Sequence, residues 1–173
     1  TYSISTGDDQ ALFSIESSTG VLTFTTAPDF DTPGDNDGDN DYLVTVTVTD
    51  SGSLTDSQAL TVTVTGANEA PVITSDSGGD TASVSVVENL TAVTTVTATD
   101  VDSGDTQVYS ISTGDDQALF SIDSSTGVLT FATAPDFETP GDTGGDNAYE
   151  VTVLVTDEGS LTDSQAITVT LTD

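Results

Sequence analysis

Acidic side chains gather in short loops of this chain, often two residues apart. The loop Thr99–Asp105 carries three of them, Asp100, Asp102 and Asp105. Two carboxylates held about 4 Å apart repel one another by roughly 4 kcal/mol at an effective dielectric constant of 20, and a bound divalent cation reverses the sign of that interaction. Because the loop offers oxygen ligands without His or Cys, it favours a hard ion such as Ca2+.

A second acidic loop, Asp35–Asp41, has an oxygen-bearing side chain at every position except Gly38, and it resembles a Ca2+ loop in its own right. The matching segment later in the chain, residues 142–148, is depleted, with Gly144 and Ala148 in place of two acids. The sequence therefore favours a polar hairpin tip here over an independent ion site.

The net charge of the chain favours cations as partners. Its 173 residues include 30 Asp and Glu and no Lys, Arg or His, so the formal charge is -30 at pH 7. Nucleic acids and anionic membrane surfaces both require basic side chains and are excluded as partners. Nucleophilic triads and catalytic zinc depend on His or Lys, so we expect no enzyme and no catalytic residue. Cys and Met are absent, and no apolar run is long enough to predict insertion into a membrane.

The acidic loops must be positioned by β-strands. Segments such as 42–49 and 60–65 alternate apolar residues with Thr at a period of two, as half-buried antiparallel strands do, and no segment has helical periodicity. In the second half of the chain we expect strands at 71–75, 82–87, 91–99, 107–112, 118–122, 127–132, 148–156 and 161–172. Seven or eight short strands in about 100 residues predict an all-β Greek-key sandwich.

The same alternation predicts the core of that sandwich. Its inward positions are Val96, Ala98, Tyr109, Ile111, Phe120, Ile122, Leu129, Phe131, Tyr149, Val151, Val153, Val155, Ile167, Val169 and Leu171. Thr occupies most outward positions, where its β-branched side chain suits an extended backbone and its hydroxyl stays in water.

Residues 2–66 align without a gap on 109–173, a period of 107 residues, and roughly four-fifths of the positions are identical. Such a repeat is typical of an array of modules along a fibre. We predict a first repeat at 1–66 that lacks its opening strands, a linker at 67–70 and a second, complete repeat at 71–173. The chain also lacks an initiator Met, so we expect a fragment cropped from a longer array. Completion of the first repeat by strands of another molecule, building a filament, is the alternative.

Five acidic motifs in this order resemble the cadherin repeat, over the whole chain. They are Val87-Glu88-Asn89, Asp100-Val101-Asp102, Asp136-Phe137-Glu138, Val155-Thr156-Asp157-Glu158-Gly159 and the linker Asn68-Glu69-Ala70-Pro71. The resemblance implies a tandem cadherin-like or immunoglobulin-like sandwich with Ca2+ between successive repeats. For the internal junction it implies the ligands Asp29, Asp31, Asn68, Glu69, Asp100, Asp102 and Asp157. It implies that Glu88, Asp136 and Glu138 serve the following junction and that Asp50 serves the preceding one.

The chain is thus similar to repeats of large calcium-binding, RTX-type bacterial surface adhesins. The resemblance implies an extracellular, cell-surface extender that Ca2+ stiffens, with adjacent repeats as partners and a role in adhesion and biofilms. Two alternatives stay open, a Ca2+-dependent carbohydrate-binding module and homophilic adhesion between identical chains. A carboxylate pair could also hydrolyse a glycosidic bond, but acids that recur at the ends of both modules favour ion binding.

Overall fold

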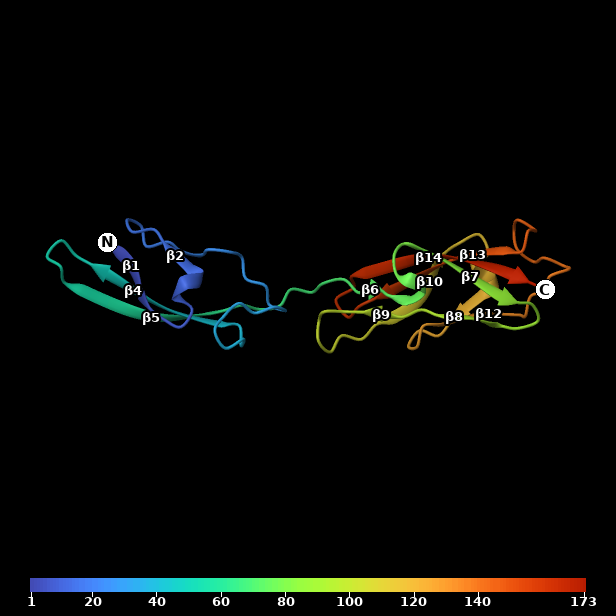
Figure 1. Ribbon diagram of the computed structural model, residues 1–173, viewed down its shortest axis with the longest axis horizontal. Coiled ribbons are helices and arrows are strands. Elements are labelled where there is room, and N and C mark those ends of the chain that lie inside the picture. The colour runs from blue at the N-terminus through green and yellow to red at the C-terminus, as the bar shows by residue number, and fades with distance from the viewer. The chain divides into compact units, whose positions relative to one another are not determined.

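The chain folds into two compact units, Thr1–Ala67 (unit 1) and Asn68–Asp173 (unit 2). A computed structural model describes residues 1–173, and each unit is described separately (Figure 1). Both units are built from β-strands with three short 3-10 helices, η1 (Gln10–Leu12), η2 (Ser75–Ser77) and η3 (Gln117–Leu119). None of these helices has the length or apolar character needed to cross a membrane.

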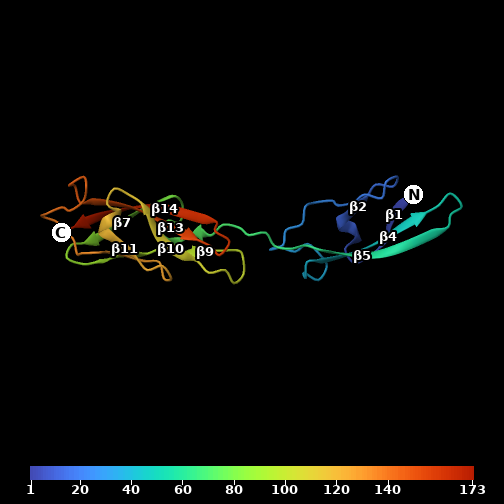
Figure 2. The same ribbon diagram turned by 180° about the vertical axis from the view of Figure 1, so that it is seen from behind.

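Unit 2 is a sandwich of antiparallel strands closed by one parallel pair. Its strands are β6 (Val72–Ile73), β7 (Thr81–Val87), β8 (Ala92–Thr95), β9 (Ala98–Thr99), β10 (Val108–Thr113), β11 (Phe120–Ile122), β12 (Val128–Phe131), β13 (Ala148–Thr156) and β14 (Thr162–Thr172). One sheet has the order β10-β13-β14-β7, a second has the order β11-β12-β8, and β6 pairs with β9. Strand β7 runs parallel to β14, from Thr81 opposite Ala166 to Val87 opposite Thr172 (Figure 2). The expected all-β sandwich is confirmed.

The structure divides the strand expected at 91–99 into β8 and β9. Strand β8 pairs with β12, whereas β9 pairs with β6, so the chain changes partner between them. Val96 lies at this change, fully buried, and its backbone N–H donates to Gly127 O at 2.9 Å. Local alternation carries no information about a change of partner, which explains the single expected strand. The expected strands at 71–75 and 118–122 are likewise shortened by η2 and η3.

The core of unit 2 lies between its two main sheets. Of the predicted core residues, Ala98, Ile111 and Ile122 are only partly buried, and the other twelve are buried. Ile73 and Ala82 are buried as well and were not expected. Ring contacts organise the centre, where Phe120 stacks on Phe131 and Phe131 meets Tyr149 edge-on.

Unit 1 repeats only the later strands of this fold. It contains β1 (Tyr2–Thr6), β2 (Phe13–Ile15), β3 (Leu22–Phe24), β4 (Asp41–Thr49) and β5 (Thr55–Thr63), in the sheets β1-β4-β5 and β2-β3. Without counterparts of β6 to β9, its core is open on one side. Val48 is 39% exposed, whereas its counterpart Val155 is fully buried.

Candidate metal centres

One acidic cluster of unit 2 forms where β9 and β13 end. Asp100 follows β9 and Asp157 follows β13, and the fold brings both beside Asp105. A carboxylate oxygen from each of these three residues lies within 4.8 Å of the others. Asp100 and Asp157 were predicted ligands. Asp105 was not assigned, although it belongs to the same acidic loop, and that membership was the signal that could have identified it.

Backbone and side-chain hydrogen bonds attach the start of unit 2 to this cluster. Asn68 Nδ2 donates to Asp157 Oδ2 at 2.8 Å, and the Glu69 N–H donates to Asp102 Oδ2 at 2.8 Å. Asp102 in turn donates its N–H to Asp100 Oδ1 at 3.0 Å. The structure therefore places the predicted residues Asn68, Glu69 and Asp102 against the cluster.

The electrostatics of this cluster suit a cation. Asp100 Oδ2 is buried and has no hydrogen-bond partner. Burial raises the pKa of Asp105, and the negative charges of Asp102 and Asp100 raise it further. The chain has no basic side chain to relieve this repulsion. An orphaned oxygen in a set of carboxylates fits a hard divalent ion such as Ca2+, which these residues would hold.

A second cluster of unit 2 lies where β7 and β14 end. The carboxylates of Glu88, Asp136 and Glu138 offer oxygens within 4.8 Å of one another. The Glu88 N–H donates to Thr172 O at 2.9 Å, which fixes this residue beside the end of β14. Glu88 Oε2 accepts a 3.1 Å hydrogen bond from the N–H of Phe137. All three predicted residues of this group are thus brought together.

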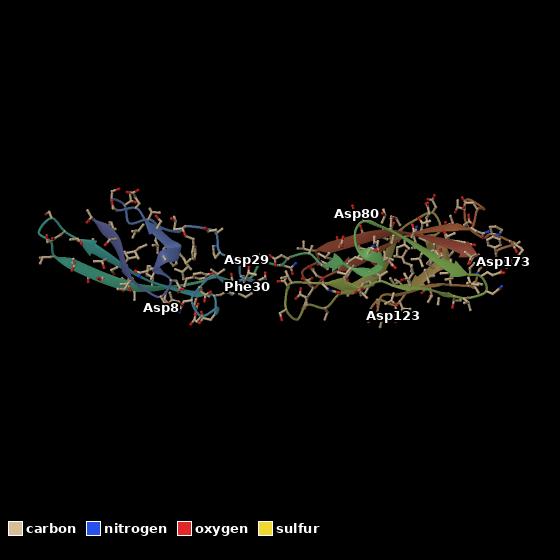
Figure 3. The ribbon with its side chains drawn as sticks, in the orientation of Figure 1. Asp8, Asp29, Phe30, Asp80, Asp123 and Asp173 are labelled. Carbon is tan, nitrogen blue, oxygen red and sulfur yellow. The ribbon has the colours of Figure 1, made fainter.

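The predicted site residues of unit 1 are more dispersed. Asp29 Oδ1 accepts a 3.0 Å hydrogen bond from the Asp31 N–H, so the two residues form one tight turn around Phe30; Asp29 and Phe30 are labelled in Figure 3. The hydroxyl of Thr32 and the Asp31 N–H hold the pKa of Asp29 below its ordinary value. Asp50 belongs to none of the acidic clusters. Its Oδ1 accepts from the N–H groups of Gly52 and Leu54 at 2.8 and 2.9 Å.

A third cluster lies in the loop for which a polar hairpin tip was favoured. Asp35, Asp37 and Asp39 of unit 1 bring carboxylate oxygens within 4.8 Å of one another. In the corresponding loop of unit 2, Gly144 stands in the place of Asp37.

Two buried aspartates were missed by the sequence analysis. Asp116 is 4% exposed and accepts hydrogen bonds from the N–H groups of Thr143 at 2.7 Å and Glu150 at 2.9 Å. Asp9 has the corresponding role in unit 1. These carboxylates fasten a loop to a strand. No sequence signal identifies them, because their partners are 27 and 34 residues away.

Fold and sites together define a β-sandwich repeat with acidic clusters at its ends. Residues 82–172, more than half of the chain, match the family model of the Cadherin domain, and the chain belongs to the cadherin family. Cadherin repeats are typically extracellular adhesion modules that bind Ca2+ between adjacent repeats, and they are not enzymes.

Solved structures give the same result for the fold. Repeats EC1-4 of Drosophila N-cadherin match with a TM-score of 0.73 and 18% identity, covering 99% of this chain and 42% of that one. The extracellular domain of protocadherin GammaB4 matches with a TM-score of 0.64 and 26% identity, covering 100% and 27%. Protocadherin gammaB7 EC3-6, described as a cis-dimer, matches with a TM-score of 0.65 and 25% identity, covering 100% and 40%. The chain thus spans less than half of each. A search of curated proteins finds no match.

Proposed function

We propose that this chain is part of a Ca2+-stiffened extender in the stalk of an extracellular bacterial adhesin. The observation that carries the proposal is the position of the two clusters of unit 2 at opposite ends of β14. Asp157 lies just before this 11-residue strand, and Glu88 is bonded to Thr172 at its far end. At about 3.3 Å per residue the strand separates the clusters by roughly 36 Å. A module with cation ligands at both ends suits end-to-end assembly.

Ligand assignment follows the sequence motifs. Asp100, Asp105 and Asp157 would hold an ion at the start of unit 2, with Asp102, Asn68 and Glu69 around it. The motif resemblance assigns Asp29 and Asp31 of the first repeat to that same junction. It assigns Glu88, Asp136 and Glu138 to the junction after the chain, and Asp50 to the junction before it. The bound ion would supply positive charge and a fixed arrangement of ligands, which limits motion between successive repeats.

The near-identity of the two repeats supports an extender, because roughly four-fifths of the aligned positions are the same and a stalk multiplies one module. Packing of most of the aromatic rings inside the units supports it over a sugar-binding module, although Tyr2 and Phe30 are exposed. Phe13 stacks on Phe24, and Phe120 stacks on Phe131.

Pairing of β7 with β14 and of β8 with β12 within one chain supports separate modules over strand exchange.

Small-angle scattering tests the extender. In Ca2+ we expect one narrow distribution of maximum dimensions, which broadens when EDTA is added. Asp100→Ala should broaden it in Ca2+ without loss of the β-sheet circular dichroism signal, because the ligand lies outside both cores. Asp8→Ala, an exposed loop acid in none of the clusters, is the matched control. Dimensions that are the same in Ca2+, in EDTA and in the Asp100 variant would contradict the proposal.

A further inference from the structure

The third acidic cluster lies within one unit and takes no part in the proposed junctions. It occupies the loop that leads into β4, and Gly38 turns the chain there with a φ of 75°. Asp35, Asp37 and Asp39 bring one carboxylate oxygen each within 4.8 Å of the others. Three like charges at this separation repel, and unit 1 has no basic side chain.

Asp35 gives a second and independent indication of a ligand. Its side chain is only 8% exposed. Its Oδ2 accepts a 2.9 Å hydrogen bond from the Asp39 N–H, but its Oδ1 is buried and has no partner. A buried carboxylate oxygen without a donor or a cation is costly. This oxygen accepts no hydrogen bond from the chain, so a cation or a water is the partner that would remove the cost.

In the corresponding loop of unit 2, the aspartate at this position has hydrogen-bond partners for both carboxylate oxygens. Asp142, the counterpart of Asp35, accepts from the Asp146 N–H at 3.0 Å and from the Asn147 N–H at 3.1 Å, so both of its oxygens are partnered. Asn40 and Asn147 each retain an unpartnered Oδ1. Among the unpartnered buried oxygens, only that of Asp35 occurs in one loop alone, and it lies in the loop that has the two additional acids Asp37 and Asp41.

Hydrogen bonds to the surrounding unit hold the loop of unit 1 in place. Asp9 Oδ1 accepts from the Asn36 N–H at 2.7 Å, and Asp9 Oδ2 accepts from the Leu43 N–H at 2.7 Å. Asn40 Nδ2 donates to Phe30 O at 3.0 Å. With both ends fastened, the acids cannot simply move apart.

We propose that the loop Asp35–Asp41 of unit 1 binds one divalent cation of the Ca2+ type through the carboxylates of Asp35, Asp37 and Asp39. Oxygen-only ligands select a hard ion, and Ca2+ accepts the flexible coordination and additional waters that three carboxylates in a loop permit. The ion binds inside a single repeat, independently of the junction ligands. Unit 2 lacks this site because Gly144 replaces the central acid.

A reciprocal exchange of one residue tests the proposal. We expect Asp37→Gly to lower the number of Ca2+ ions bound by one, measured by calorimetric titration of the chelator-treated chain, and Gly144→Asp to raise it by one. The φ of Gly144 is not in the left-handed region, and an added Cβ would lie 3.1 Å from Asp146 Oδ1 and 3.3 Å from Asp142 Oδ2, so these two carboxylates must shift by a few tenths of an ångström to accept a side chain. A new acid there would therefore join two existing ones.

Amide NMR separates this site from the junctions. In the wild-type chain, Ca2+ should shift the Gly38 amide, while in Asp37→Gly and in Asp37→Asn that response should be lost with the dispersion of unit 1 retained. Asp100→Asn should leave the Gly38 response unchanged, so failure at the junction is distinguishable from failure here. An unchanged ion count in Asp37→Gly, or a Gly38 amide that does not respond to Ca2+, would overturn the proposal.

Discussion

Asn68 Nδ2 donates a 2.8 Å hydrogen bond to Asp157 Oδ2, and this contact ties the first residue of unit 2 to the residue that follows β13. The other oxygen of Asp157 accepts from the Leu161 N–H at 2.7 Å, and the side chain is 5% exposed. Asp157 is thus both a candidate ligand and a structural residue of the β13-β14 hairpin. The two roles predict different effects of mutation on stability in EDTA and in Ca2+.

Asp157→Ala should destabilise unit 2 even in EDTA, because it removes the buried carboxylate that accepts the Leu161 N–H in the β13-β14 hairpin. Loss of one such partner costs about 1 to 3 kcal/mol. Asp100→Ala should lower the free energy of unfolding more in Ca2+ than in EDTA. Urea unfolding of both variants in EDTA and in Ca2+ separates the roles. If Asp157→Ala matched the wild type in EDTA, its hydrogen bonds would not be structural.

Removal of Ca2+ should lower the melting temperature of the chain, and added Ca2+ should restore it. With a Kd of about 0.1 mM and Ca2+ at about 10 mM, each site contributes roughly 2.7 kcal/mol to the free energy of unfolding. Mg2+ should substitute poorly, because it prefers a tight octahedron and keeps its waters. Calorimetric scans in EDTA, Mg2+ and Ca2+ measure this. Identical melting in all three would contradict ion binding at every cluster.

Gly127→Ala should destabilise unit 2 far more than Gly145→Ala. Both glycines have a positive φ, 69° and 68°, so the backbone strain of the new side chain is nearly the same. A Cβ at Gly127 would fall on the carbonyl oxygen of Val96, whereas one at Gly145 meets nothing within 4 Å. Urea unfolding should show about 1 kcal/mol for Gly145→Ala and several times that value for Gly127→Ala. Equal losses would show that the β8-β9 segment moves freely.

Gln165→Ala should cost about 2 to 3 kcal/mol, because the side chain is fully buried and its loss leaves a cavity and an unpaired carbonyl. Gln165 Nε2 donates to Gly79 O at 3.0 Å. The matched control is Gln58→Ala, at the same position of unit 1, where the glutamine is exposed and the change should be below about 0.5 kcal/mol. Hydrogen exchange of backbone amides, measured separately for each unit, gives the loss of stability for both variants. A loss at Gln58 equal to that at Gln165 would contradict the burial argument.

Asp123 should stabilise unit 2 at neutral pH, and this contribution should be lost in acid. The N–H and hydroxyl of Thr126 and the N–H of Ser125 hold the pKa of Asp123 below its ordinary value of 3.8. A lowered folded pKa stabilises the fold above 3.8, and this contribution is lost as the pH falls through the folded value. Carboxyl NMR should place the midpoint below 3.8, and Asp123→Asn should be less sensitive to pH in that window. A midpoint at or above 3.8 would show that the turn hydrogen bonds do not form.

The acidic motifs could be predicted because their geometry is local. The turns Asp29-Phe30-Asp31 and Asp136-Phe137-Glu138 are closed by hydrogen bonds between residues two apart, so each motif is a local structure, while its role as a ligand pair was implied by the cadherin resemblance. Glu88, by contrast, was placed with Asp136 only through the family resemblance. In the structure it reaches Phe137 over 49 residues.

The sequence by itself determined the strands, the two repeats and most of the core, because alternation at a period of two and a self-alignment are properties of the chain. Only the tertiary structure decided the neighbours of each residue. It split 91–99 where the chain changes partner, buried Gln165 while leaving the identical Gln58 exposed, and brought Asp105 to Asp157. The physical reason is that burial and electrostatic repulsion depend on the strands that cover a residue, and those strands come from distant parts of the chain.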